Sequence, residues 1–503
     1  MAIRKVLGVE TEYGIIIRGG ESNPIAASSV LINAYIQELA RSGTASASPR
    51  TGWDFEDEHP GNDARGYRIE GQFPPEVETH LVNAVLTNGA RYYVDHAHPE
   101  LSTPECADPR SIVVFDRAAE RILQRSMAAA AALLPDGQEI VVYKNNSDRK
   151  GNSYGTHENY LVDRAVPFAQ IVAQVMPHFI TRQIYTGAGK VGTEAAGLTS
   201  AEVPYQITQR ADFFEEEVGL ETTLKRPIVN TRDEPHADPQ KYRRLHVIVG
   251  DANLSEVATF LKVGTTALVL CMIEDDWLSR DLLPARPVQT LRHVSYDLTL
   301  QRPFDLADGT SMTALEAQWE LYRRADLYAQ ERGLECIGGE EVGREVLRRW
   351  EAVLTGLESD LSSLATTVDW VAKHRVLNGY RERHDLRWDD ARLAAMDLQY
   401  HDLRPDKSLA ARVGLERIVS DAEVEAAMMH PPLDTRAYFR GRCLQRWPQS
   451  VVAANWDSLV FDIGGDPLRR VPMMEPLRGT EAHVGSLIDS CDSALELLQK
   501  LER

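Results

Sequence analysis

Four short segments of the chain place chemically versatile side chains two residues apart. The pairs are Glu10 and Glu12, Tyr93 and Asp95, His157 and Asn159, and Arg244 and His246. Residues i and i+2 of a strand project from one face, so each pair would present its polar groups together. Carboxylates, imidazoles and a phenol that converge could hold a hard divalent cation, and oxygen ligands together with substrate phosphates favour Mg²⁺. An arginine beside them could bind a phosphate group.

A structural explanation of the same pattern stays open. Any half-exposed antiparallel sheet alternates polar and apolar residues, and this is enough to account for a single pair such as His157 and Asn159. The Glu10/Glu12 pair, in the run GVETEYG, is less easily explained, because parallel carboxylates repel one another unless a cation or hydrogen bonds relieve them. His98 and Glu100 follow Asp95 and would extend its polar face. Spacing alone does not show whether the four pairs converge in space.

The elements that would position these pairs are strands, set in a mixed pattern of strands and helices. Alternating or β-rich sequence predicts strands over Lys5–Ile17, Arg91–Asp95, Thr156–Val162 and Arg244–Val249. Apolar residues at spacings of three and four predict helices over Ser28–Arg41, Met312–Arg332, Glu340–Val371 and Glu481–Leu501. The second half of the chain is therefore expected to be the more helical.

The segment Arg41–Arg68 interrupts this pattern, because it contains no Ile, Leu, Val or Met. Such a composition cannot bury enough apolar surface to offset the entropy of ordering. We expect a long mobile loop that adds nothing to the core and is either an inert insertion or a gate. Its bulky aromatic residues, Trp53, Phe55 and Tyr67, could dock on the rim of a pocket.

A second interruption is the run MHPPL at Met429–Leu433. A proline pair ends regular structure, and helical and strand-like stretches resume after it. We expect a domain boundary here, which divides the chain into a large catalytic domain, 1–430, and a small C-terminal domain, 431–503.

Composition restricts the function classes. The 503 residues carry 55 basic and 75 acidic side chains, a formal net charge of −20, which disfavours a nucleic-acid partner. The five cysteines are scattered and form no CxxC pair, so neither a disulfide framework nor a structural zinc site is expected. No run approaches the roughly 18 uninterrupted apolar residues of a membrane helix, and Glu10 and Glu12 interrupt any signal peptide. These features favour a cytoplasmic protein without a membrane partner.

One motif imitates a nucleotide-binding loop. Gly187–Gly192 (GAGKVG) satisfies GxGxxG, but Ile184 stands where a P-loop has its first glycine and Val191 where it has Ser or Thr. The dinucleotide fingerprint needs a strand before the glycines, whereas Phe168–Tyr185 has a helical pattern. We interpret the run as a helix end followed by a turn.

Four motifs, taken in order along the chain, resemble one enzyme family. They are GVETEYGI from Gly8, YYVDHAHPELSTPE from Tyr92, NNSDRKGNSYGTHENYL from Asn145 and RRLHVIVGDAN from Arg243. The family comprises the Pup ligase and the Pup deamidase/depupylase, which attach and remove a prokaryotic ubiquitin-like protein (Pup) and are related to glutamine synthetase and carboxylate–amine ligases. The insertion at Arg41–Arg68, the DHAHPE run and the GTHENY form most resemble the deamidase/depupylase branch.

The resemblance implies an α+β fold: a glutamine synthetase-like large domain with a curved, mainly antiparallel sheet cradle backed by helices, plus a small C-terminal domain. It implies that Asp95 is the catalytic carboxylate. It further implies a Mg²⁺ set and an ATP set, which overlap at Glu10. The metal residues are Glu10, Tyr93, Glu100, His157 and His246. The nucleotide residues are Gly8, Val9, Glu10, Thr11, Glu12, Ser102, Thr103, Asn159 and Arg244.

The implied reaction is hydrolysis of a glutamine or glutamyl amide, with ATP as a bound cofactor. The substrates would be the C-terminal glutamine of Pup and the isopeptide that joins Pup to a lysine of a pupylated protein. Asp95 could act as a general base or attack directly. Because Pup is acidic, a basic groove is expected, and the densest basic run is Lys225, Arg226, Arg232, Lys241, Arg243 and Arg244; a solvated face balanced by nearby acids is the alternative. A monomer is expected.

Three other functions stay open at this point. The nearest is a Pup ligase, which would form the isopeptide with ATP hydrolysis. A small-molecule carboxylate–amine ligase of the glutamine synthetase type would turn over ATP with glutamate and an amine. A nucleotide-binding scaffold without chemistry is the third, and the complete set of carboxylate, imidazole and arginine groups argues against it.

Overall fold

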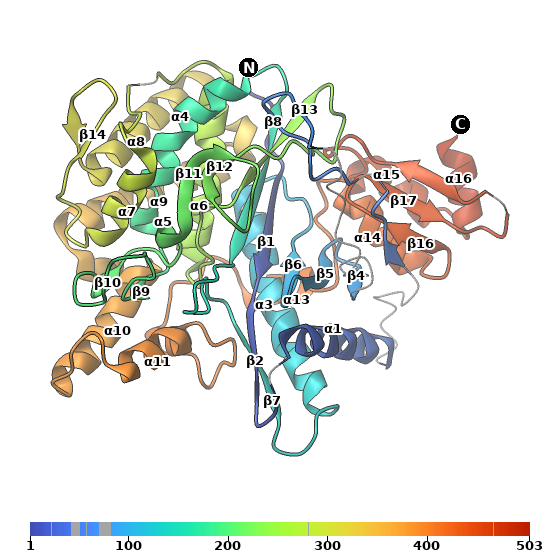
Figure 1. Cartoon of the computed structure of the whole chain (residues 1–503). Coiled ribbons are helices and arrows are strands. Elements are labelled where there is room, and N and C mark those ends of the chain that lie inside the picture. The colour runs from blue at the N-terminus through green and yellow to red at the C-terminus, as the bar shows by residue number, and fades with distance from the viewer. Residues whose placement is uncertain are drawn as a thin grey trace.

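A six-stranded sheet lies at the centre of the molecule. The computed structural model describes residues 1–21, 23–41, 51–56, 58–69, 82–279, 281–465 and 467–502. All neighbouring strands of this sheet are antiparallel. Its strands, in spatial order, are β13 (Tyr242–Val247), β8 (Thr156–Asp163), β1 (Leu7–Glu12), β6 (His98–Ser102), β5 (Arg91–Asp95) and β4 (Asn83–Val85). Figure 1 shows the sheet with a helical half on one side and the C-terminal part of the chain on the other.

The sheet has one apolar and one polar face. In β1 the residues alternate between buried and half-buried, with Leu7, Val9 and Thr11 buried. That side packs into the main hydrophobic core, where α1 (Pro24–Arg41), α3 (Pro109–Ala131) and α6 (Glu256–Glu274) contact the strands. The other face carries Glu10 and Glu12. The predicted α+β fold, an antiparallel sheet cradle backed by helices, is confirmed.

The first predicted strand, Lys5–Ile17, is in fact two strands. β1 ends at Glu12, and β2 (Gly14–Arg18) leaves the central sheet to pair with β7 (Glu139–Tyr143). The change of partner occurs at Gly14, where a Cβ atom would lie 2.4 Å from Asn145 Oδ1 and 2.6 Å from the Tyr154 hydroxyl. A glycine is therefore required for the close approach of the 145–154 loop beneath the sheet.

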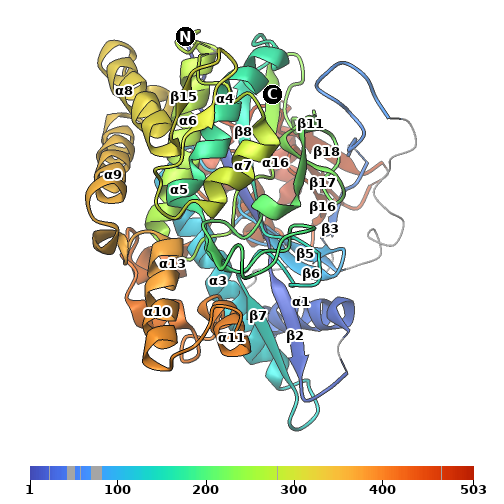
Figure 2. The same ribbon diagram turned by 60° about the vertical axis from the view of Figure 1, so that its left-hand side comes forward.

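The helices of the second half form layers beside the sheet (Figure 2). Two predicted helices are interrupted. Glu340–Val371 contains α9 (Glu340–Ser359), after which Asp360 caps a short 3₁₀ turn and α10 (Asp369–Arg383) begins. Glu481–Leu501 contains α15 (Glu481–Asp489) and α16 (Ala494–Leu501), and Ser493 caps the second. Asp and Ser accept backbone hydrogen bonds at helix starts, and this local chemistry overrides the continuous apolar stripe.

The other regular elements complete the two sides of the sheet. They are α4 (Phe168–Thr181), α5 (Gln183–Thr186), β9 (Lys190–Val191), β10 (Tyr205–Gln206), β11 (Phe214–Gly219), β12 (Arg226–Asn230), α7 (Pro287–Tyr296), β14 (Phe304–Asp305), β15 (Ser311–Met312), α8 (Ala314–Arg332), α11 (Ala391–Tyr400), α12 (Leu409–Val413), α13 (Asp421–Ala427) and α14 (Ala437–Arg446). α6 is long and apolar enough to cross a membrane by composition alone, but it is wholly buried inside the protein.

Two minor predictions are confirmed. The run Gly187–Gly192 follows the end of α5 and turns through Gly189, whose φ is +71°, into β9, so it is a turn after a helix. All five cysteines are buried and free.

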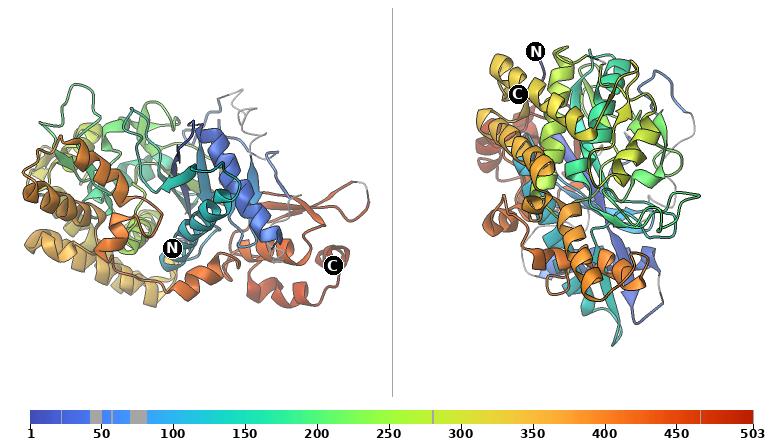
Figure 3. Two further views of the ribbon diagram at one scale, coloured as in Figure 1. Left: turned by 90° about the horizontal axis from the view of Figure 1, so that it is seen from below. Right: turned by 90° about the vertical axis from the view of Figure 1, so that its left-hand side faces the viewer.

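A second hydrophobic core lies in the C-terminal part of the chain. A four-stranded sheet, in the order β18 (Arg469–Pro472), β17 (Ser458–Phe461), β16 (Val451–Ala454) and β3 (Gly52–Trp53), packs with α14, α15 and α16. Seen from below, this C-terminal unit stands to one side of the central sheet (Figure 3). Its outermost strand β3 comes from the segment Arg41–Arg68, more than a chain's half-length away in sequence.

The expectation that Arg41–Arg68 adds nothing to a core is therefore wrong at Trp53. Its indole is 7% exposed, belongs to the second core and meets Trp456 edge to face, with ring centroids 5.2 Å apart. β3 pairs in parallel with β16, and Arg470 of β18 lies 2.7 Å from Asp54. Residues 42–50, and the mobility expected of them, lie outside the described residues. The described residues 51–56 are thus held by a tryptophan in a distant core, by strand pairing and by an ion pair.

We expect Trp53→Ala to lower the free energy of unfolding by about 3 kcal/mol, because it empties a tryptophan site in a packed core. Tyr67→Ala is the control: Tyr67 is an aromatic residue of the same segment but is 49% exposed, and its loss should cost less than about 0.5 kcal/mol. Denaturant unfolding of the three proteins measures both values. Equal stability of wild type and Trp53→Ala would show that the segment does not contribute to the core.

Candidate active site

The polar residues of the four strands meet on one face of the central sheet. In the strand registers Glu10 lies opposite both His157 and Ser102, and Glu12 lies opposite Glu100. Glu100 in turn faces Tyr93 across β5 and β6. Directly opposed residues share a face, so the strand registers bring together the pairs that spacing alone could not place. The sequence predicted each pair of polar residues, but it did not predict the order of the strands in the sheet.

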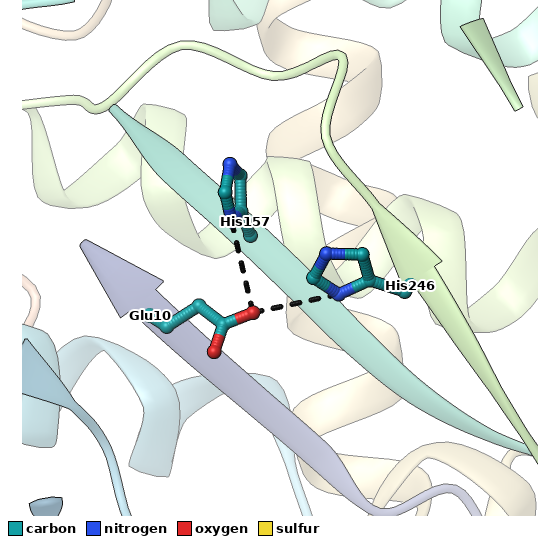
Figure 4. Close-up of side chains that lie close together, drawn as sticks. All are labelled: Glu10, His157 and His246. Atoms are coloured by element: carbon teal, nitrogen blue, oxygen red, sulfur yellow. Dashed lines mark ion pairs between the residues drawn. The ribbon is translucent and has the colours of Figure 1, made fainter. Parts of the chain in front are cut away.

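One cluster consists of Glu10, His157 and His246 (Figure 4). Oε1 of Glu10 lies 3.4 Å from Nδ1 of His246 and 3.7 Å from Nδ1 of His157. Burial would raise the pKa of Glu10, but the hydrogen bond from His157 and the charges of His246 and Arg244 lower it below its ordinary value. Burial also lowers the pKa of both imidazoles. The cluster therefore offers a carboxylate and two imidazoles, a donor set suited to a metal ion.

The second cluster consists of Glu12, Asp95 and Glu100, whose carboxylate oxygens lie within 4.8 Å of one another. Burial and the charge of Asp95 raise the pKa of Glu12 to about 8. Burial and the charges of Asp95, Glu12 and Glu10 raise the pKa of Glu100 well above its ordinary value. Burial would also raise the pKa of Asp95, but a hydrogen bond from His96 and the positive charges of His96, His157 and Arg91 lower it. Asp95 is thus the member of the cluster that stays ionised.

The two clusters refine the predicted metal set. Glu12, Asp95 and Glu100 form an all-oxygen set, which fits Mg²⁺, and their mutual repulsion is what a bound cation would relieve. Glu10, His157 and His246 form a mixed nitrogen and oxygen set. The repulsion expected between Glu10 and Glu12 is not what perturbs Glu12, because its main charged neighbour is Asp95. Tyr93 is 8% exposed, and its hydroxyl lies 3.4 Å from Ser102 Oγ.

A pocket opens beside these clusters, between the central sheet and the C-terminal unit, with about 590 Å³ of space that is partly open solvent. Seven of the nine predicted nucleotide residues line it: Gly8, Val9, Glu10, Ser102, Thr103, Asn159 and Arg244. The other two do not. Thr11 points into the core and meets Thr156 Oγ1 at 3.0 Å, and Glu12 belongs to the carboxylate cluster. Thr103 also has a structural role, because its Oγ1 accepts a hydrogen bond from Val9 N.

Several residues of the pocket were missed by sequence reasoning. They include Glu105, Pro235, His236, Arg436, Trp456 and Pro476. Arg436 and Trp456 come from the C-terminal unit, and Trp456 lies in the turn between β16 and β17. An isolated tryptophan in a turn gives no signal of its own, so its place in the pocket follows only from how the two parts of the chain pack.

Arg244 is fixed by groups on both sides. Its guanidinium donates to Asn159 Oδ1 at 2.8 Å and to the Glu234 carbonyl at 2.7 Å. Other members of the basic run are also paired, such as Lys241 with Asp238 and Glu475. Arg226 donates from Nη2 to the Ser153 carbonyl at 2.6 Å and lies close enough to Glu12 to lower the pKa of that carboxyl. Its buried Nε, like the Nε of Arg232 and of Arg243, has no hydrogen-bond partner among the described residues. The run is therefore not one free basic groove.

A test of the carboxylate cluster follows from the pKa of Glu12. In metal-free protein the folded state keeps a proton on Glu12 up to about pH 8, whereas the unfolded chain releases it near 4.5. The contribution of this group to the free energy of unfolding therefore falls as the pH rises from 4.5 to about 8. In EDTA, we expect Glu12→Gln to melt at a higher temperature than wild type above pH 8, and the difference to vanish toward pH 4.5.

Glu38→Gln, on the exposed side of α1, is the control and should follow wild type at every pH. Differential scanning calorimetry across the pH range measures the three melting temperatures. If Glu12→Gln and wild type showed the same pH dependence in EDTA, the crowded carboxylates would not be a source of instability.

Known proteins share this fold and sequence over nearly the whole chain. The crystal structure of the complex between Pup and its ligase PafA matches with a TM-score of 0.79 and 32% identity, over 99% of this chain and 94% of that one. The ligase PafA in complex with ADP matches with a TM-score of 0.73 and 37% identity, over 81% and 89%. The fold is thus that of the solved Pup ligases.

Sequence comparison gives the family directly. The family model described as Pup-ligase protein matches residues 5–460. The "Depupylase" of Acidothermus cellulolyticus is 52% identical over 99% of both chains, and the "Pup deamidase/depupylase" of Mycolicibacterium smegmatis is 47% identical over 99% of this chain and 100% of that one. The chain belongs to the Pup-ligase protein family, and the predicted resemblance is confirmed.

Proposed function

We propose that this protein is a hydrolase of amide bonds that deamidates the C-terminal glutamine of Pup and cleaves the isopeptide between Pup and lysine side chains. The observation that carries the proposal is the ionised Asp95, placed among carboxylates beside a pocket that seven of the predicted nucleotide residues line. The two relatives with names of this activity are also more similar to the chain than the two solved ligases are.

Asp95 is the group that acts on the amide. As a general base it takes a proton from water, whose oxygen bonds to the amide carbon; the C–N bond then breaks and the leaving nitrogen receives a proton. As a nucleophile it bonds to the same carbon and the C–N bond breaks, while the leaving nitrogen takes a proton from water; the hydroxide that remains then opens the anhydride and frees Asp95. In both routes the products are glutamate and either ammonia or a lysine amine. Arg226, with its unpartnered Nε, is the donor we assign to the carbonyl oxygen.

ATP is the nucleotide we assign to the pocket, as a bound cofactor that is not consumed. Trp456 would offer an aromatic face to the base, and Arg244 would contact phosphate. Mg²⁺ would be held by Glu10, Glu12, Glu100, His157 and His246, with Tyr93 beside them, and when bound would neutralise phosphate and carboxylate charge. The ADP-bound ligase of the same fold supports a nucleotide site.

We extend the proposal to partners and location. Free Pup and pupylated proteins would be the substrates, and the complex of a related ligase with Pup supports the first of these. A monomer in the cytoplasm is proposed, and the five free, buried cysteines favour a reducing compartment.

The test is incubation of the protein with glutamine-ended Pup, Mg²⁺ and ATP. Mass spectrometry should show replacement of the terminal amide by a carboxylate. The amount of ammonia released should equal the amount of Pup converted. The amount of ADP should not rise in proportion to the Pup converted. A non-hydrolysable ATP analogue should support the reaction. ADP formed in step with a new Pup–lysine bond would instead identify a ligase, and absence of both products would overturn the proposal.

A further inference from the structure

Arg91 lies between two aromatic rings at the edge of the active site. It begins β5, and its guanidinium carbon is 4.0 Å from the ring centroid of Trp53 and 3.9 Å from that of Tyr93. A planar guanidinium stacks on aromatic faces, and it is attracted to them electrostatically. The side chain is 12% exposed, so this contact is shielded from water. Trp53 belongs to the inserted segment and Tyr93 to the catalytic sheet, which makes Arg91 the link between them.

Polar contacts fix Arg91 in this position. Its Nε donates to Asn83 Oδ1 at 3.0 Å, and its Nη1 lies 3.8 Å from Glu58 Oε1. The same Glu58 oxygen accepts a hydrogen bond of 2.7 Å from Trp53 Nε1. Glu58 therefore fixes both the indole and the guanidinium. Arg91, Trp53 and Glu58 thus contact one another pairwise.

Tyr93 is held at both ends of its side chain. Its ring is covered by Arg91, and its hydroxyl contacts Ser102 Oγ at 3.4 Å and hydrogen-bonds with the Glu100 carboxylate. Glu100 lies opposite it in the register of β5 and β6. A phenol that must stand beside a carboxylate cluster needs a fixed ring plane, and the stacked guanidinium supplies it.

The inserted segment also contacts a residue that holds Arg244 of the pocket. The backbone N–H of His59 donates to the Glu234 carboxylate, and the carbonyl of Glu234 accepts from Arg244. Thr231 Oγ1 donates to Asp63 Oδ2 at 2.7 Å. Residues 51–56 and 58–69, which we call the clasp segment, thus contact a residue of the catalytic face and the partner of a phosphate-binding arginine.

We propose that Arg91 is a positioning residue that holds the Tyr93 phenol in its working orientation, so that the active site is complete only when the clasp segment is seated. The inference rests on the proposed function, because it assigns Tyr93 a part in amide hydrolysis. It makes the clasp segment a fixed part of the site, whereas its composition left open an inert insertion or a gate.

A double-mutant cycle with Arg91→Ala and Tyr93→Phe tests the proposal. Phenylalanine keeps the ring for stacking and removes only the hydroxyl. We expect Arg91→Ala to lower kcat of Pup deamidation by about tenfold or more in the wild-type background, and by less than about twofold in the Tyr93→Phe background. KM for Pup should stay within about threefold in all four proteins. Lysine keeps the positive charge but cannot stack as a planar group, so kcat of Arg91→Lys should lie between those of wild type and Arg91→Ala.

Two measurements do not depend on activity. Trypsin should cut the clasp segment at Arg65 or Arg68 faster in Arg91→Ala than in wild type, because the segment loses its link to the sheet. Binding of Mn²⁺, followed by electron paramagnetic resonance, should weaken by the same factor in Arg91→Ala, in Tyr93→Phe and in the double variant. Arg381→Ala is the control, since Arg381 stacks on Trp388 at 5.5 Å far from the site and should leave both measurements unchanged.

Equal loss of kcat from Arg91→Ala in both backgrounds would overturn the proposal, because Arg91 would then act on the fold and not through Tyr93. Unchanged trypsin cleavage together with unchanged Mn²⁺ binding would also overturn it. If Arg91→Ala does not fold, Arg91→Lys takes its place in the cycle. If wild type itself does not deamidate Pup, the proposed function fails, whereas the cleavage and Mn²⁺ measurements still decide whether Arg91 seats the segment and orders Tyr93.

Discussion

Asp95→Asn should reduce Pup deamidation and depupylation together by about 1000-fold or more. Asparagine keeps the shape of the side chain and removes both its charge and its basicity. Burial and the neighbouring acids would favour a protonated carboxyl here, yet the hydrogen bond from His96 lowers the pKa of Asp95. The protein therefore keeps this one carboxylate ionised among three. Nucleotide affinity should stay near wild type, because Asp95 does not line the pocket.

The control for this variant is Asp163→Asn. Asp163 ends β8 of the same sheet, about 20 Å along the strand from His157, and its carboxylate accepts only a local hydrogen bond from Ala165 N among those described. Steady-state kinetics, with nucleotide binding measured by calorimetry, compares the two variants. Deamidation by Asp95→Asn near the wild-type rate would remove Asp95 from the chemistry. A single turnover in ¹⁸O-labelled water separates its two possible roles, because label can enter the Asp95 carboxylate only if that carboxylate attacks.

The strands of the site could be predicted because their chemistry is local. Alternation along β1 placed Glu10 and Glu12 on one face, and β5 was predicted with its observed bounds, Arg91–Asp95. The order of the strands in the sheet, in contrast, depends on contacts between residues far apart in the sequence. Glu12 meets Glu100 and Asp95 only because β1 lies beside β6 and β6 beside β5, and no spacing within one strand encodes that order.

The wrong and missing predictions also concern contacts between distant parts of the chain. The average composition of Arg41–Arg68 correctly indicated a segment that cannot form a hydrophobic core of its own. The prediction that the segment adds nothing to any core failed because Trp53 packs into a core supplied by residues about 400 positions later. Trp456 and Arg436 of the pocket were missed for the same reason. The family resemblance supplied the roles of residues but not these contacts, which depend on how the C-terminal unit packs against the sheet.

Glu10→Ala should weaken nucleotide binding in the presence of Mg²⁺ by about 100-fold and abolish deamidation as a consequence. Glu10 contributes the only carboxylate of its cluster, and it stays ionised because His157 and His246 lie against it. It also accepts a hydrogen bond from Asn159, which holds Arg244 in turn. Removing the carboxylate therefore disturbs both the metal donors and the phosphate contact, while the apolar face of β1 is untouched.

The melting temperature without nucleotide should accordingly change little. Glu10→Gln keeps the shape and the contact to Asn159 but not the charge, so it should lose most of the affinity if the carboxylate binds the cation, and little of it if Glu10 only orders its neighbours. Calorimetric titration with ATP, in Mg²⁺ and in EDTA, distinguishes these cases for all three proteins. Affinity unchanged in both variants would leave Glu10 as a polar residue on a half-exposed sheet face, and the metal ion would then have to be held by the Glu12, Asp95 and Glu100 cluster alone.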